Sequence, residues 1–151
     1  AAPAVGNGIA YVASLDQHVR AYLLSDDRTP LWQYLTESPL RTSPTLIDDS
    51  LYQQVPGRGL VCLEADPADA PGGRERWWAE TGGVVITRIG DDLVCWDATN
   101  RTIDLVEARL GAVIDRIEVP DALEVRASST NAGELYVSGG DGRILRLVPR
   151  Q

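Results

Sequence analysis

Apolar and polar residues alternate in short runs along this chain, and the runs recur at a nearly fixed interval. Tyr11, Tyr52, Val94 and Tyr136 hold one equivalent position, at spacings of 41, 42 and 42 residues. Each of them follows a turn-like segment rich in Gly, Asn or Asp. Alternation of this kind is typical of strands, and a sequence repeat of this length indicates that one structural unit is built several times.

Each repeat is predicted to contain four short strands, joined by tight turns. The innermost strands are expected at residues 2–5, 43–47, 84–89 and 124–129. The second strands are expected at residues 9–13, 51–55, 93–97 and 134–138. The third strands are expected at residues 18–23, 60–64, 102–107 and 143–148. A fourth strand is expected only three times, at residues 30–35, 76–80 and 112–119.

Helical periodicity is absent, and a period in the low forties made of strands is typical of the blades of a β-propeller. The fold class predicted from the pattern is therefore all-β. We expect a β-propeller of about four four-stranded antiparallel blades, the last without its outer strand, in one domain over residues 1–151. The blades are expected at approximately 1–40, 41–82, 83–122 and 123–151.

Several segments follow a recognisable blade motif. Residues 135–144 read Leu-Tyr-Val-Ser-Gly-Gly-Asp-Gly-Arg-Ile, residues 43–46 read Ser-Pro-Thr-Leu, and residues 8–16 repeat the second strand and its turn. An outer-strand tryptophan is present as Trp32 and as Trp77 or Trp78, whereas Asp115 stands at that place in the third unit. The motif resembles the PQQ-like repeat of quinoprotein dehydrogenases and BamB-type propellers, over the whole chain. This resemblance is specific to the repeat type and much less so to any function.

The recurring aromatic residues are interpreted as contacts between blades. A large ring at a fixed place on a strand can bury roughly 150–250 Å² against the neighbouring sheet. We therefore assign a structural docking role, in preference to ligand stacking, to a set of five side chains: Trp32, Trp77, Tyr11, Tyr52 and Tyr136.

Trp96 differs, because it lies on a second strand where the other units have Ala13, Gln54 and Ser138. It either fills core space left by small neighbours, which is the favoured interpretation, or faces a central channel.

Charge and composition narrow the classes of partner. The net charge is -8 and the isoelectric point is about 4.5, with 14 Arg and no Lys among the basic residues. Nucleic acids and anionic membrane surfaces attract proteins with a positive face, so neither is expected as a partner. No run of apolar residues is long enough to insert into a membrane.

Candidate catalytic chemistry is sparse. The resemblance implies, for the dehydrogenases of this fold, a PQQ site with vicinal cysteines and a Ca²⁺ ion, but Cys62 and Cys95 are 33 positions apart. The acidic pairs 26–27, 48–49 and 91–92 all lie in turns, where such residues are ordinarily solvated. His18, the only histidine, also adjoins a turn. We therefore expect no catalytic residues, no metal site and no cofactor, and two buried thiols in preference to a disulfide.

Two functions from different classes remain. The first is a non-catalytic binding or scaffold module that presents its rims to a protein or peptide partner. The resemblance implies relatives that scaffold outer-membrane assembly or sense ligands outside the cell. The second is a fragment of a PQQ-dependent quinoprotein oxidoreductase. The pairs Arg74/Arg76 and Arg143/Arg146 are either polar interaction surfaces or, as the favoured alternative, solvated charges at strand edges.

The blade count raises the question of closure. PQQ-like propellers typically have eight blades, so four blades suggest half of a larger ring. An open sheet edge invites pairing with another chain, and we expect either self-association or a longer parent chain. The resemblance and the Ala-Pro start favour an extracytoplasmic location, periplasmic or secreted, in a bacterial cell, with a cytoplasmic location as the alternative.

Overall fold

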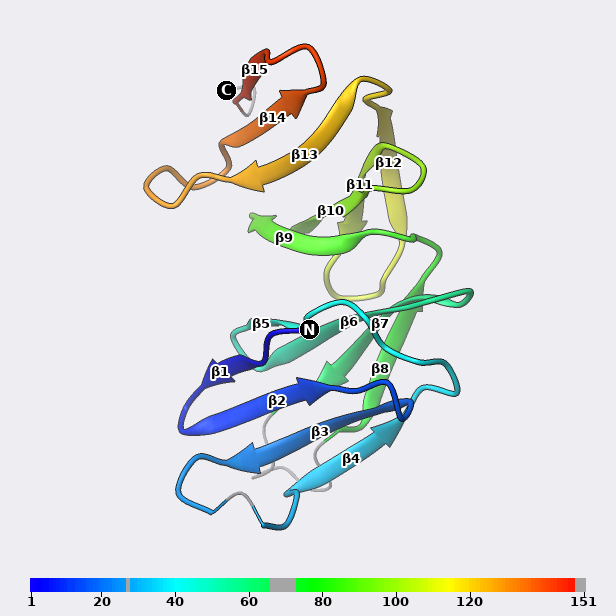
Figure 1. The fold of residues 1–151 in the computed structure, drawn as a ribbon, viewed down its shortest axis with the longest axis vertical. Helices are drawn as coiled ribbons and strands as arrows, with labels where there is room; N and C mark the ends of the chain where they lie inside the picture. Colours follow the sequence, from blue (N-terminus) through cyan, green and yellow to red (C-terminus); the bar gives the residue numbers. More distant parts are fainter. Residues whose placement is uncertain (27, 66–72, 149–151) are drawn as a thin grey trace. The chain divides into compact units, whose positions relative to one another are not determined.

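Antiparallel sheets make up the chain in a computed structural model that describes residues 1–26, 28–65 and 73–148 (Figure 1). Within these residues all regular secondary structure is β-strand, arranged as three four-stranded sheets and one three-stranded sheet. The all-β, four-sheet architecture predicted from the repeat is confirmed, including the shorter last sheet.

The strand order in every sheet follows the order in the sequence. The first sheet contains β1 (Ala4–Gly6), β2 (Ile9–Ala13), β3 (His18–Leu23) and β4 (Trp32–Leu35). The second contains β5 (Thr45–Ile47), β6 (Ser50–Val55), β7 (Gly59–Glu64) and β8 (Glu75–Ala79). The third contains β9 (Val84–Ile89), β10 (Asp92–Asp97), β11 (Thr102–Glu107) and β12 (Val113–Glu118). The fourth contains β13 (Ala122–Ala127), β14 (Leu135–Gly139) and β15 (Ile144–Leu147).

Tight hairpins set this meander, and the first shows why. Gly6 on β1 pairs with Ile9 on β2, so the loop between them is only Asn7 and Gly8. Both residues have positive φ, at 53° and 75°. A two-residue loop with this geometry matches the right-handed twist of the flanking strands, and Asn-Gly is the dipeptide that adopts it most readily.

The sheets fall into two compact units, Ala1–Glu80 and Thr81–Gln151, each with two sheets. In unit 1, one face of β2–β4 packs on β5–β7 through a buried apolar cluster that includes Tyr11, Trp32, Leu51 and Val61. In unit 2, β10 and β11 pack on β13 and β14 through a cluster that includes Val94, Ile103 and Val137. The prediction of one domain over residues 1–151 stays a prediction.

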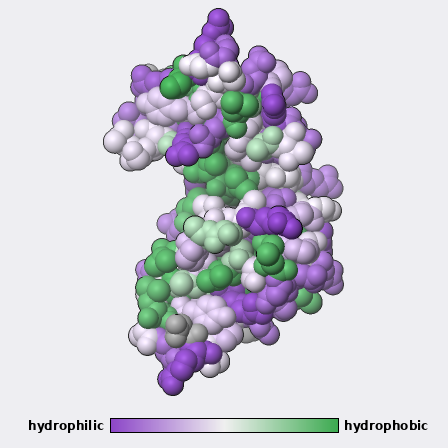
Figure 2. Space-filling model, in the orientation of Figure 1, coloured by the Kyte–Doolittle hydropathy of each residue, from purple (hydrophilic) through white to green (hydrophobic). Residues whose placement is uncertain are grey.

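Polar residues and small apolar groups are interspersed on the visible face of each unit (Figure 2). The strands alternate accordingly. β2 has the pattern of a half-covered strand, whereas β7 is buried along nearly its whole length on both faces. A strand buried on both faces reads as a continuous apolar run, and the sequence of β7 does so from Leu60 to Leu63.

Candidate interaction site

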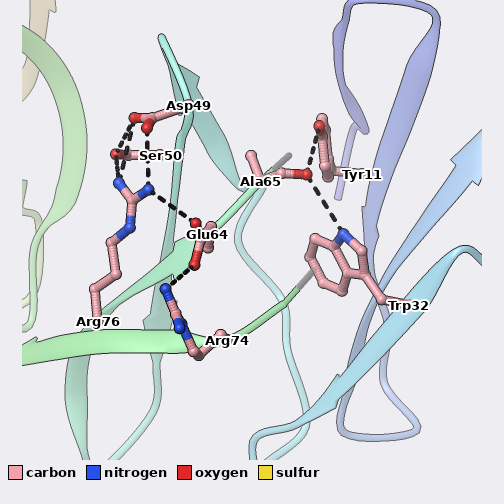
Figure 3. A network of polar contacts seen from close by, with 8 residues as sticks. All are labelled: Tyr11, Trp32, Asp49, Ser50, Glu64, Ala65, Arg74 and Arg76. Carbon is pink, nitrogen blue, oxygen red and sulfur yellow. Dashed lines mark hydrogen bonds and ion pairs between the residues drawn. The ribbon is translucent and has the colours of Figure 1, made fainter. Parts of the chain in front are cut away.

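The carbonyl oxygen of Ala65, just after β7, receives two aromatic side chains from the neighbouring sheet of unit 1 (Figure 3). Tyr11 donates its hydroxyl to this oxygen at 3.2 Å, and Trp32 donates its indole N–H at 3.4 Å. The two rings are tilted against each other with centroids 5.9 Å apart. The pair therefore joins one sheet to the next by ring packing and by hydrogen bonds to the same acceptor.

The same pair recurs in the second sheet. Tyr52 and Trp77 have ring centroids 5.8 Å apart and a similar tilt. Trp77 lies opposite Cys62 on β7, as Trp32 lies opposite Ala21 on β3. The register therefore identifies Trp77, and not Trp78, as the repeat tryptophan.

Trp78 lies one residue further along β8 and has a different partner. The Arg58 guanidinium lies over its ring, 4.4 Å from the centroid. This contact is a cation–π interaction at a half-buried position, a kind that typically contributes about 0.5–1 kcal/mol.

In unit 2 the aromatic pair is replaced. Val94 holds the tyrosine position on β10, and Asp115 lies opposite Leu105, at the tryptophan position on β12. The third sheet therefore carries an aliphatic side chain and a carboxylate where the first two sheets carry a Tyr–Trp pair.

Tyr136 on β14 keeps the tyrosine position but not its burial. It lies opposite Arg126 on β13 and Arg146 on β15, just as Tyr11 lies opposite Ala4 and Ala21. Tyr136 is 39% exposed, whereas Tyr11 is 3% exposed. The docking role assigned to Tyr136 from the sequence stays a prediction, and its ring is accessible to another molecule.

The two arginines beside Tyr136 carry their own counterions. Arg126 pairs with Glu124 at 2.7 Å, and Arg146 forms a bidentate pair with Glu134. The hydrogen bond from Arg146 lowers the pKa of the Glu134 carboxyl, so this pair is ionised at neutral pH. The side chains around Tyr136 therefore carry positive and negative charges that nearly cancel.

An apolar hollow of about 280 Å³ lies in unit 2, between the β12–β13 connection and the β14–β15 hairpin. Its apolar lining comes from Val119, Ala122, Val137 and Leu145. Val137 belongs to the buried apolar cluster of unit 2, and Val119 packs against that cluster. Leu145, in contrast, is 59% exposed.

Ala122, which lines the hollow, is small and buried. Val119 N–H binds Arg101 O, as Thr36 N–H binds Gln17 O in unit 1. Beyond Thr36 the chain buries Leu40 in the core of unit 1, and beyond Val119 it buries Ala122.

The mouth of the hollow is polar. Arg143 pairs with Asp141 at 3.2 Å, and the Asp121 carbonyl accepts a hydrogen bond from Gly140 N–H. Asp121 is itself one of the residues that line the hollow. At about 280 Å³ the hollow is just below the usual range of small-molecule sites, about 300–1,000 Å³, so it suits a side chain better than a cofactor.

The Arg74/Arg76 pair lies in a network within the second sheet (Figure 3). Arg76 donates to both oxygens of Asp49, at 3.2 and 3.0 Å, and lies 3.6 Å from Glu64. Arg74 reaches the other oxygen of Glu64 at 2.7 Å. The hydrogen bond from Arg76 lowers the pKa of Asp49. These arginines therefore hold the β5–β6 turn to the β7–β8 end of the sheet.

The remaining sequence candidates lie as follows. Trp96 is buried in the apolar cluster of unit 2, which favours its interpretation as a core residue. Cys62 and Cys95 are both free and buried, as the sequence predicted, and burial raises the pKa of each thiol to about 12. They are therefore protonated at neutral pH, whereas a cysteine nucleophile acts as the thiolate. The ring of His18 lies against the Asp16 carbonyl.

The described residues contain no cluster of three or more His, Cys, Asp or Glu side chains that could hold a metal ion. Over the same residues, no helix is long and apolar enough to cross a membrane.

Comparison with solved structures supports the fold. The chain is similar to the computationally designed protein Ika8, with a TM-score of 0.75 and 14% identity over 98% of this chain. It is similar to BamB from Moraxella catarrhalis, with a TM-score of 0.73 and 20% identity over 97% of this chain. It is also similar to the computationally designed protein Ika4, with a TM-score of 0.72 and 14% identity over 99% of this chain.

The chain spans 45% of Ika8 and 44% of BamB, less than half of either, but 90% of Ika4. No family model and no curated protein matches the sequence. At these identities the comparisons establish the architecture alone. The chain is built as the sheets of a β-propeller.

Proposed function

We propose that this chain is a non-catalytic protein-binding module of the PQQ-like repeat type, acting as a scaffold outside the cytoplasm. The observation that carries the proposal is the apolar hollow of unit 2, whose lining includes the largely exposed Leu145. The hollow takes an apolar side chain from a segment of a partner protein. The extracytoplasmic location rests on the resemblance to the repeat type.

The surroundings of the hollow indicate which segment fits. Asp121 and Asp141 are both among the residues that line the hollow, and Asp141 is paired with Arg143. The lining residues therefore include two aspartates and one arginine, and the whole chain has a net charge of -8. A segment with a basic residue beside the apolar one matches this charge, since complementary charge speeds encounter and suppresses wrong partners.

Protein binding suits these groups better than catalysis does. The two thiols are buried and protonated. Asp141 beside the hollow and Glu124 near Tyr136 are bound by arginines at short distance. Such pairs hold a surface in shape, whereas a catalytic acid or base has to exchange protons with a substrate.

Site-specific photo-crosslinking tests the proposal. A photoreactive amino acid at Leu145, in extract of the source cell, is expected to give one adduct with a partner protein. The same group at Leu110, which is also exposed, at 64%, but lies in the β11–β12 turn, serves as the control. Ala122→Leu, which places a larger side chain in the lining of the hollow, is expected to abolish the adduct. Equal labelling from both positions, or an adduct that survives Ala122→Leu, would overturn the proposal.

The proposed absence of a cofactor is tested separately. PQQ is titrated with and without Ca²⁺ while the fluorescence of the four tryptophans is followed. We expect no quenching at concentrations up to tens of micromolar. Saturable, Ca²⁺-dependent quenching would instead favour a fragment of a quinoprotein oxidoreductase.

A further inference from the structure

We propose that the exposed face of β13–β15, around Tyr136, binds a second copy of this chain on the outer face of β1–β4. The contact repeats the one by which β1–β4 binds β5–β8 within unit 1. In it, the Tyr136 hydroxyl donates to the backbone carbonyl oxygen of Leu24 in the second copy. This inference does not rest on the proposed function, because the hollow opens beside Leu145, whereas Tyr136 and Ile144 point to the opposite face of the sheet.

The donor side follows from the register. Tyr11 and Tyr136 occupy the same place in their sheets, each at the centre of a row across three strands. Tyr11 uses that place to reach a carbonyl on the next sheet, Ala65 O, at 3.2 Å. Tyr136 presents the same group on a face where its ring is 39% exposed.

The acceptor side follows from the backbone. Ala65 lies just after the third strand of its sheet, and its N–H binds Asp49 O at 2.9 Å. Leu24 lies just after the third strand of the first sheet, and its N–H binds Gly8 O at the same distance. Leu24 is therefore the residue of the first sheet that corresponds to Ala65, and it is 61% exposed.

The faces around these two residues also correspond. In the second sheet, the face that receives the first sheet includes Leu51 and Leu63, paired across β6 and β7 and both fully buried. In the first sheet, the paired residues at these positions are Ala10 and Tyr22, which are half-buried. The next pair on this face is Val12 and Arg20, and Arg20 is paired with Asp16 at 2.7 Å. A partly exposed face of apolar and polar side chains is thus present where a preceding sheet would pack.

The comparisons with Ika8 and BamB, though not the one with Ika4, favour a second copy as what covers both faces. Ika8 and BamB each align with nearly all of this chain over less than half of their own length. A second copy supplies an equal amount of the same fold. Two copies in head-to-tail contact place each Tyr136 face on the other copy's Leu24 face, so a closed pair leaves neither surface exposed.

Three arginines make this contact weaker than the internal one. Arg126 stands where Ala4 and Thr45 stand, and Arg20 on the receiving face stands where the fully buried Val61 stands. Arg146 stands where Ala21 and Cys62 stand in the first two sheets. It brings its own counterion, Glu134, so no unpaired charge is buried, but the pair is more polar than the packing around Tyr11. We therefore expect a dimer that dissociates on dilution.

Sedimentation velocity over a range of protein concentrations tests the proposal. The expected result is a species of twice the chain mass of 16.4 kDa, in equilibrium with the monomer. Tyr136→Phe removes the hydroxyl from both contacts of the closed pair and is expected to weaken the dimer about 25-fold, about fivefold for each contact. Leu24→Asp is expected to abolish it, whereas Leu15→Asp, at a residue that is exposed to the same extent, is expected to leave it unchanged. A monomer at all concentrations would overturn the proposal.

Mixing two variants tests the head-to-tail geometry and controls for misfolding. Tyr136→Ala keeps an intact Leu24 face, and Leu24→Asp keeps an intact Tyr136 face. Each is expected to be monomeric alone, and their mixture is expected to form a heterodimer through the one intact contact. Both variants should give the circular dichroism spectrum of the parent chain. If they do and the mixture still does not associate, the proposed contact between the Tyr136 face and the Leu24 face is wrong. Loss of the dimer leaves the Leu145 crosslink unaffected, so the two proposals fail independently.

Discussion

At the scale of single residues, the Ala65 carbonyl explains why tyrosine and tryptophan recur together. The two side chains come from different strands of one sheet, yet both donate to that oxygen. A buried carbonyl has two lone pairs, and leaving it without a partner costs about 1–3 kcal/mol. The pair is therefore a single device that fixes the spacing of two sheets, and losing one member does not leave the acceptor unpaired.

A substitution at Gly73 tests how much the packing around Trp32 contributes to stability. It has a φ of 79°, and a Cβ built on it would lie 2.5 Å from Cε3 of Trp32. Gly73→Ala is expected to reduce the free energy of unfolding by about 2 kcal/mol or more, from backbone strain and overpacking together. Gly8→Ala is the matched control, because Gly8 has a φ of 75° and nothing within 4 Å of that Cβ. Equal losses in urea denaturation of the two variants would show that the contact with Trp32 contributes nothing.

Asp104 gives unit 2 an acid-sensitive contact. Its carboxylate is fully buried and accepts a bidentate pair from Arg116, at 2.8 and 2.9 Å. Burial by itself would raise the pKa of this carboxyl, but hydrogen bonds from Arg116 and Thr81 outweigh it, and the pKa is lowered. A lowered pKa in the folded state stabilises the fold above the unfolded value of about 3.9, and this contribution is lost as the pH falls through the folded pKa.

Asp104→Asn is therefore expected to cost about 2 kcal/mol at pH 7, where the charged pair is intact in the parent chain. The cost is expected to shrink as the pH falls from 4 to 2. Denaturation at a series of pH values measures both effects. A cost that stays constant down to pH 2 would contradict the assignment of the acid-sensitive contact to Asp104.

At the scale of strands, the sequence predicts several strands with the bounds that the structure has. The bounds of β2, β3, β9 and β11 are those predicted from alternation and turn residues. The first strand was predicted too early, at residues 2–5, because Pro3 has no N–H for the ladder and Ala2 N–H binds Ser43 Oγ instead. β13 lies two residues before its predicted place, since Ser128 caps a turn through Thr130 and Asn131.

The candidate sites were predictable to different degrees. The repeat pattern identified the aromatic residues and placed Tyr136 in register with Tyr11. It could not identify their acceptor, because a backbone carbonyl has no signature in the sequence. The hollow was also missed, although the small Ala122 is visible in the sequence. Its lining comes from the β12–β13 connection and the β14–β15 hairpin, and the sequence does not show that these two segments lie together.

β15 is expected to be the least protected strand of unit 2. All four of its residues are exposed, whereas β11 is buried along most of its length. Segments with few buried apolar contacts open locally at low free-energy cost. Hydrogen exchange followed by mass spectrometry should show Ile144–Leu147 exchanging well before Thr102–Glu107. Equal protection of both segments would contradict this expectation.

At the scale of the whole molecule, charge opposes the pairing of two copies. Each copy carries a net charge of -8, so two copies repel at long range, while the Tyr136 and Leu24 faces attract at short range. The ion pairs beside Tyr136 are formed within one copy, so they contribute little attraction across the interface.

Salt is therefore expected to strengthen the dimer. Raising the ionic strength from about 0.01 to 0.1 M shortens the screening length from about 30 to about 10 Å, which weakens repulsion between the two charged copies more than contacts inside the interface. We expect the dissociation constant to fall several-fold in sedimentation velocity over this range, with the unfolding midpoint of the monomeric Leu24→Asp variant as a control for stability. A dissociation constant that rises with salt would show instead that opposite charges on the two copies hold the pair together, and would shift attention from Tyr136 to Arg126 and Arg146.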